Sequence, residues 1–175
     1  MTIALDRQTF DLPALDIDPL VYRRTLGSYP TGVSVITVAT TEGASGMVVG
    51  TFTSISLDPP IVGFFPTSNS STLTDIIQAG HFCVNVLGSD HEHLSRKFCG
   101  PREERFDGVA THPARSGAPQ LDEALLWIDC TLERVVPVGD HMLVTGRVHD
   151  LSENHLQKTD PLVFHRGSYF GLDPR

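Results

Sequence analysis

Hydrophobic and polar positions alternate along most of the chain, and this pattern predicts strands. Seven runs are rich in β-branched and apolar residues: 33–38, 47–57, 61–65, 82–87, 125–136, 142–151 and 162–170. Such runs are typical of strands when Gly, Pro and polar residues separate them. Seven strands with only short helices favour an antiparallel barrel or sandwich over a doubly wound sheet.

Helical spacing is confined to short segments. Asp18 and Pro19 suit the cap and first turn of a helix that stops at Gly27 or Pro30. The residues before it, 1–18, read as a flexible N-terminal arm, so we expect a single domain over 19–175.

Two further short helices are expected between the strands. One covers 72–79 after a polar loop, and the capping box formed by Ser89 and Glu92 begins another that runs to about Phe98. Residues 100–120 are rich in Gly, Pro and charge, so a long loop is expected there.

Composition excludes several classes of protein. Thirteen Lys and Arg against 21 Asp and Glu give a net charge of −8, which disfavours binding to nucleic acid or to an anionic membrane surface. No apolar run approaches the roughly 20 residues of a membrane span, and the acidic N-terminus does not resemble a signal peptide. The three cysteines are too few and too widely spaced for a disulfide scaffold or a Cys-rich zinc site. A cytoplasmic protein is therefore expected.

Two segments could bind an anion, although the sequence has no GxGxxG or Walker A motif. Residues 69–72 place hydroxyls at a helix N-terminus, where backbone N–H groups and the helix dipole favour phosphate. Segment 96–105 concentrates Arg96, Lys97, Arg102 and Arg105 in an otherwise acidic chain. Plain helix capping and a solvated helix end are the alternative explanations.

Hydroxyl side chains crowd the predicted strand from Thr51 to Ser56. They suit a strand that faces a polar ligand, and Gly50 before them permits close approach of a planar group to the backbone. An edge strand that faces water is an equally good explanation.

The eight histidines show no metal-ligand spacing, so no metal site is expected. His141 differs from the others because it follows Gly139 and Asp140 at the start of a strand, where a turn presents side chains at the mouth of a barrel. A surface or capping histidine is the alternative.

Taken together, these segments resemble the flavin reductase family with the FMN-binding split-barrel fold. The resemblance extends from about Tyr22 to Leu172. It rests on the segments 29–33, 46–47, 51–60, 82–87, 105–106, 139–141 and 161–169, in this order and spacing.

The resemblance implies a mainly β fold, an antiparallel Greek-key split β-barrel with a few short helices. It implies an NAD(P)H:flavin oxidoreductase that moves a hydride from NADH or NADPH to FMN or FAD. It also implies a homodimer and a separate flavin-dependent monooxygenase that receives reduced flavin. The main alternative is a non-catalytic FMN-binding or redox-sensing protein. A pyridoxamine-phosphate-oxidase-like enzyme is disfavoured because no basic substrate site is visible, and a lipocalin-like carrier because 51–56 is too polar.

The resemblance also implies roles for individual residues. The flavin ring and ribityl chain would lie along Val48, Val49, Gly50, Thr51, Phe52, Thr53, Ser54 and Ser56. The flavin phosphate would be held by Ser70, Ser71 and Thr72, with Arg96, Lys97, Phe98 and Arg105 completing the cofactor site. His141, the candidate catalytic residue, would lie near the nicotinamide, and Tyr169 would line the same face.

Overall fold

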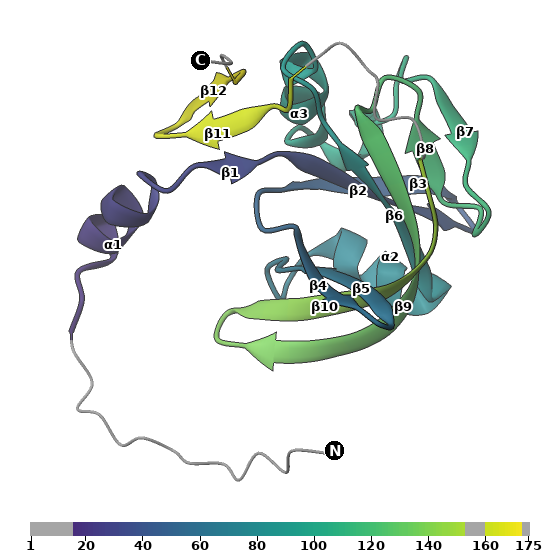
Figure 1. Ribbon diagram of the computed structural model, residues 1–175, viewed down its shortest axis with the longest axis horizontal. Coiled ribbons are helices and arrows are strands. Elements are labelled where there is room, and N and C mark those ends of the chain that lie inside the picture. Colours follow the sequence, from purple (N-terminus) through teal and green to yellow (C-terminus); the bar gives the residue numbers. More distant parts are fainter. Residues whose placement is uncertain (1–15, 153–159, 173–175) are drawn as a thin grey trace, which may run out of the picture.

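A seven-stranded antiparallel sheet organises the protein (Figure 1). The computed structural model describes residues 16–152 and 160–172, so the first 15 residues of the predicted arm lie outside the described residues, as do 173–175 of the predicted domain. The strands of this main sheet are β2 (Ser34–Thr40), β3 (Gly43–Val49), β4 (Thr53–Leu57), β5 (Pro60–Phe64), β6 (His81–Val86), β9 (Leu126–Val138) and β10 (His141–Leu151).

The order of strands in the main sheet is β3-β2-β6-β9-β10-β5-β4. Every neighbouring pair is antiparallel. The sheet curls so that its two edge strands, β3 and β4, follow one another in the chain without pairing in the described part of the structure (Figure 1). The mainly β, antiparallel fold with a few short helices predicted from the sequence is confirmed.

Two small sheets and three short helices complete the fold. The small sheets are β1 (Thr31–Gly32) with β11 (Val163–His165) and β12 (Ser168–Phe170), and β7 (Thr111–Pro113) with β8 (Pro119–Leu121). The helices are α1 (Pro19–Leu26), α2 (Ser71–Ala79) and α3 (Glu92–Phe98), with a 3₁₀ turn at Arg102–Glu104. Within the described ranges, no helix is long and apolar enough to cross a membrane.

The core has two parts. In one, α2 buries Leu73 and Ile76 against the main sheet, where Phe64 and Phe82 meet edge to face with ring centroids 5.3 Å apart. In the other, α3 packs Leu94 and Phe98 against the opposite part of the sheet. The other buried residues of this second part of the core are Val33, Val35, Leu87, Leu121, Ala124 and Leu162.

Three of the expected elements differ from those observed. The predicted strand 47–57 is two strands, β3 and β4, which lie at opposite edges of the main sheet. The predicted strand 162–170 is the β11–β12 hairpin, in which Arg166 and Gly167 form the turn with φ values of 50° and 80°. The predicted loop 100–120 contains the 3₁₀ turn, β7 and the start of β8.

Buried polar groups hold segment 100–120 in place. Asn85 accepts a hydrogen bond from the backbone N–H of Leu121 at 2.8 Å, and Thr37 donates to the carbonyl of Pro119. Fully buried Asp129 accepts from the N–H and hydroxyl of Ser116, at 2.8 and 2.6 Å. Because a buried polar group without a partner is costly, these contacts order a segment whose composition is that of a loop.

Candidate functional site

A cavity of about 420 Å³ opens between the edge strand β3 and the start of α2. We call it the central cavity. It brings together nine of the residues selected from the sequence, namely Val48, Val49, Gly50, Thr51, Ser70, Ser71, Thr72, Arg105 and His141. It also contains Met47, Phe65, Pro66 and Thr67, which the sequence did not single out because no local pattern marks them.

One wall of the central cavity is the backbone from the end of β3 to Thr51. The Thr51 hydroxyl accepts the backbone N–H of Phe65 at 2.9 Å, which ties this segment to the end of β5. A Cβ on Gly50 would lie 2.7 Å from the Thr31 hydroxyl oxygen, so the glycine leaves room for Thr31 beside this wall. Gly50 is exposed and has no side chain, so the wall offers backbone groups to a ligand there.

The opposite end of the cavity is suited to an anion. Ser70 caps α2 by accepting the N–H of Leu73 at 3.3 Å, and Ser71 is exposed. Buried Thr72 donates to the carbonyl of Gly46 at 3.3 Å. First-turn N–H groups have no acceptor within a helix, so they are available to a bound anion beside the Ser71 hydroxyl.

Arg105 supplies the positive charge next to this helix end. Its Nη1 donates to the carbonyl of Gly46 at 2.7 Å and its Nε to the carbonyl of Gly100 at 3.0 Å. A Cβ on Gly46 would lie 2.8 Å from the Phe98 ring, so the glycine leaves room for that ring beneath it. Two hydrogen bonds to fixed backbone hold the guanidinium, and its remaining N–H groups are free to bind phosphate.

His141 closes the cavity from the start of β10. Its ring Nδ1 lies 2.7 Å from the Asp140 carboxylate, and its backbone forms an antiparallel bridge with Thr67. The hydrogen bond from His141 and the adjacent imidazole hold the pKa of the fully exposed Asp140 below its usual value. With Nδ1 directed at Asp140, Nε2 is the ring atom left to contact a ligand.

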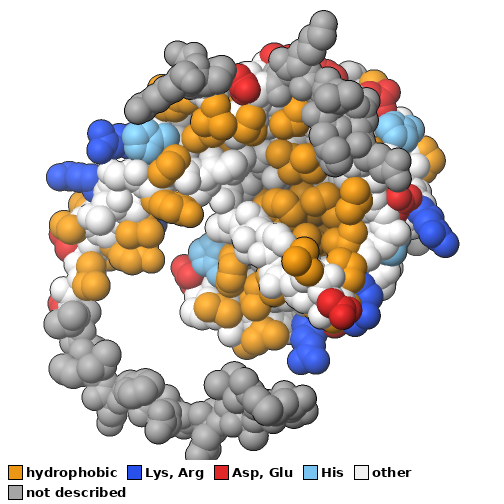
Figure 2. All heavy atoms as spheres, in the orientation of Figure 1, with side chains coloured by type: hydrophobic (Ala, Val, Ile, Leu, Met, Phe, Trp, Pro, Cys, Tyr) orange, Lys and Arg blue, Asp and Glu red, His pale blue; other side chains and the backbone are white. Residues whose placement is uncertain are grey.

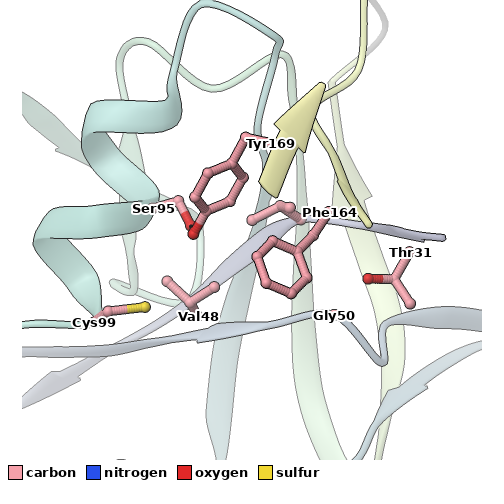
Figure 3. Close-up of a pocket in the computed structure, with 8 residues that line it drawn as sticks. Thr31, Val48, Gly50, Ser95, Cys99, Phe164 and Tyr169 are labelled. Atoms are coloured by element: carbon pink, nitrogen blue, oxygen red, sulfur yellow. Dashed lines mark hydrogen bonds between the residues drawn. The ribbon is translucent and has the colours of Figure 1, made fainter. Parts of the chain in front are cut away.

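A second cavity of about 210 Å³ shares Val48 and Gly50 with the central cavity (Figure 3). We call it the aromatic cavity because Phe164 and Tyr169 lie in it, with ring centroids 5.2 Å apart. The remaining lining residues are Thr31, Val33, Ser95 and Cys99. Since the two cavities share a wall, ligands bound in both would lie next to each other.

Tyr169 is fixed on two sides. Its hydroxyl lies 2.8 Å from the Ser95 hydroxyl. Figure 3 shows the two side chains pointing toward one another. The Arg96 guanidinium lies over the ring, 5.3 Å from its centroid, and is itself paired with Glu92 at 2.6 Å. Tyr169 therefore presents a rigid aromatic surface to the cavity.

The basic segment does not act as one cluster. Arg105 lines the central cavity, Arg96 lies beside the aromatic cavity, and Arg102 pairs with Asp75 on α2 at 2.8 Å. Neither Lys97 nor Phe98 lines the central cavity; Phe98 is buried beneath Gly46.

The hydroxyl-rich strand β4 lies at the edge of the main sheet. The central cavity is not lined by four of the residues selected from the sequence, namely Phe52, Thr53, Ser54 and Ser56. Thr53 donates to the backbone carbonyl of Ser54 at 3.2 Å. No group of three or more His, Cys, Asp or Glu side chains with metal-binding geometry occurs within 16–152 and 160–172.

The protein is thus mainly β and has two adjoining cavities, one beside a helix N-terminus and Arg105 and the other lined by Phe164 and Tyr169. Residues 26–173 match the model of the flavin reductase like domain. A flavin reductase of Pseudomonas putida is 40% identical over 157 residues, which are 89% of this chain and 91% of that protein.

Solved structures agree with the sequence match. Component B of a nitrilotriacetate monooxygenase from Mycobacterium thermoresistibile superposes with a TM-score of 0.85 at 40% identity, covering 89% of this chain and 87% of that one. The NADH:FAD oxidoreductase SgcE6 of Streptomyces globisporus, in complex with NAD and FAD fragments, gives 0.83 at 29% identity, covering 92% and 98%. The chain belongs to the flavin reductase family. It is an oxidoreductase by this membership.

Proposed function

We propose that the protein is an NAD(P)H:flavin oxidoreductase that reduces FMN or FAD and passes the reduced flavin to a separate monooxygenase. The observation that carries this proposal is the wall shared by the central and aromatic cavities, Val48 and Gly50. The two cavities meet at these residues, so a planar ligand in each could touch the other there, and direct hydride transfer requires such contact between the rings.

The residues of the central cavity fit a flavin. The first turn of α2 and Arg105 would hold the flavin phosphate, since both present unpaired N–H donors at one end. The backbone from Met47 to Thr51 would lie along the ring, where Gly50 leaves room for close approach. The volume is in the usual range of small-molecule sites.

The bound flavin supplies the redox chemistry, because it accepts a hydride from the dihydronicotinamide. The protein's part is to position the rings and exclude water. Asp140 holds the His141 ring so that Nε2 can accept a hydrogen bond from the nicotinamide carboxamide. Hydride transfer needs no general base, so we assign His141 a binding and orienting role rather than proton transfer.

Tyr169 would contact the nicotinamide from the other side. Its ring is fixed by Ser95 and Arg96, and it lies in the cavity next to the proposed flavin site. Either FMN or FAD can be accepted on this reasoning, because the central cavity is open at the surface and nothing in its lining excludes an adenylate extension.

We also propose a homodimer. Helix α1 buries none of its residues and stands away from the main sheet (Figure 1). Its apolar side chains Leu20, Val21, Tyr22 and Leu26 are at least half exposed, and Tyr29 is 70% exposed. Figure 2 shows apolar side chains gathered along this helix. An exposed apolar surface of this extent is typical of a protein contact.

A separate monooxygenase partner is proposed because one similar protein is a component of such an enzyme. The activity is tested by mixing purified protein with NADH or NADPH and with FMN or FAD, and following the absorbance of the reduced nicotinamide. Oxidation that depends on added flavin supports the proposal and gives both specificities. Flavin binding without oxidation would support the redox-sensing alternative instead.

A further inference from the structure

Three arginines meet where helix α1 leads into β1. They line a cavity of about 590 Å³ together with Ser28 and two glycines, and the full set is Arg23, Arg24, Gly27, Ser28, Arg166 and Gly167. We call it the junction cavity. In Figure 2 basic side chains lie at the left edge of the molecule, over the end of α1 that leads into β1.

The junction cavity is held together by contacts between segments far apart in the sequence. The backbone N–H of Arg166 donates to the carbonyl of Gly27 at 2.9 Å. Its Nε donates to the Ser28 hydroxyl at 3.3 Å. The tip of the β11–β12 hairpin is thereby fastened to the end of α1, and Arg166 lines the same cavity as Arg23 and Arg24.

Arg166 also occupies a costly backbone conformation. It is the only non-glycine residue with positive φ within the described ranges, at 50°. Arg166 and Gly167 have the φ values of a type I′ turn, whose first position favours Asn or Gly. A strained residue that persists at a charged cavity points to a role in binding.

The three positive charges are not neutralised by the described part of the chain. None of the ion pairs between described residues includes Arg23, Arg24 or Arg166, although the chain as a whole carries a net charge of −8. The dipole of α1 favours Arg23 and Arg24 in its last turn, but it does not account for Arg166. Guanidinium groups brought together in this way suit phosphate.

The junction cavity is lined by residues that are close in sequence to residues of the aromatic cavity. Thr31 follows Ser28 by three residues, and Phe164 precedes Arg166 by two. The residues of the two cavities therefore follow one another on the segment leading into β1 and at the end of β11. A dinucleotide whose ring lies in the aromatic cavity could extend its phosphates along these segments.

We propose that the junction cavity binds the phosphate groups of the nicotinamide dinucleotide while its ring lies in the aromatic cavity. The inference rests on the proposed function and names the phosphate-binding residues of the electron donor, Arg23, Arg24 and Arg166. Arg105 lies apart from these three arginines, in the central cavity, where it would bind the flavin phosphate.

The test compares Arg24→Ala and Arg166→Asn with Arg115→Ala, an exposed arginine of the β7–β8 connection. Arg166→Asn removes the charge and suits the turn, so folding is preserved. The first readout is the Kd for NADH of flavin-free protein, measured by nicotinamide fluorescence. The second is KM for NADH and for N-benzyl dihydronicotinamide, a donor without phosphate.

Each junction variant should raise the Kd and KM for NADH by about three- to tenfold, the effect of one charged hydrogen bond. The KM for the phosphate-free donor and the Kd for FMN should not change, and Arg115→Ala should match the wild type. Unchanged NADH binding, with wild-type turnover intact, would overturn this inference alone. An equal loss with both donors, or a changed sedimentation coefficient without a change in NADH binding, would also overturn it. Wild-type protein that oxidises neither donor would instead contradict the proposed function.

Discussion

The His141 imidazole donates its Nδ1–H to the Asp140 carboxylate across 2.7 Å. Because that hydrogen bond lowers the pKa of Asp140, the carboxylate stays ionised below its usual range of pH and keeps the ring in one tautomer. The free Nε2 then has a defined role as an acceptor. Neither residue needs burial for this, since the pair is adjacent in sequence, with Asp140 in the turn and His141 at the start of β10.

We predict that His141→Ala raises KM for the nicotinamide donor by about tenfold, the value of one hydrogen bond in a partly exposed site. The Kd for flavin should change little, because His141 meets only the edge of the central cavity. Steady-state kinetics and flavin fluorescence measure the two quantities. Asp140→Asn should have a smaller effect of the same kind, and an unchanged KM for His141→Ala would contradict the orienting role.

Arg105→Ala should weaken binding of FMN by at least about tenfold, because the variant loses a charged contact with the flavin phosphate. Riboflavin has no phosphate and serves as the matched ligand, whose Kd should stay the same. Quenching of flavin fluorescence gives both constants. Equal losses for FMN and riboflavin would mean that Arg105 supports the cavity through Gly46 and does not bind phosphate.

Gly146 lies in β10 against the buried Phe82 and Cys130. A Cβ there would lie 2.7 Å from Phe82 Cε1 and 2.9 Å from Cys130 Cβ. Gly146→Ala should therefore lower the free energy of unfolding by about 1–3 kcal/mol, the cost of overpacking. Gly32→Ala is the control, since nothing lies within 4 Å of its Cβ. Urea unfolding gives the free energy of unfolding of both variants. An unchanged value for Gly146→Ala would show that Phe82 and Cys130 move to make room for the added Cβ.

The three cysteines should differ in reactivity. Cys99 is exposed, whereas Cys83 and Cys130 are buried. Burial and the nearby Asp129 carboxylate raise the pKa of the Cys83 thiol and raise that of Cys130 to about 12. A thiol reagent should therefore label Cys99 alone in the native protein and all three in urea. Labelling of Cys99→Ser in the native state would contradict this assignment.

The same thiols predict a loss of stability at alkaline pH. The folded pKa of Cys130, about 12, lies above the ordinary thiol value of 9.0, so the unfolded chain ionises first. The stabilisation is present below 9.0 and is lost as pH rises from there toward 12. Between pH ~8 and ~10 the free energy of unfolding should fall by about 1 kcal/mol more in wild type than in Cys130→Ala. Equal losses would show that Cys130 does not contribute.

Sequence patterns predicted the fold where local chemistry decides it. Asp18 and Pro19 fix the start of α1, and alternation identifies most strands. The break at Gly50–Phe52 was not predicted, because a single glycine inside such a run also fits a bulge in one strand. β3 pairs with β2 and β4 with β5 in two consecutive hairpins, and the nonlocal pairs β2–β6 and β5–β10 place β3 and β4 at opposite edges of the sheet. Such nonlocal pairing is not encoded in any short window.

The candidate site was predictable to the extent that its residues are contiguous. Segments 48–51 and 70–72 each contribute as a unit to the central cavity. The basic segment did not behave in this way, because α3 and the 3₁₀ turn direct Arg96, Arg102 and Arg105 toward different neighbours. The junction cavity could not be predicted from the sequence, because Arg166 is more than 130 residues away from Ser28.

Val48 and Gly50 belong to both cavities, and this has a thermodynamic consequence. Any rearrangement of that wall that the first ligand causes is already complete when the second ligand binds. Affinity for the first ligand must then depend on the presence of the second, and by linkage the factor is the same in either direction. The order in which the two substrates arrive would alter the path of binding but leave the strength of the ternary complex unchanged.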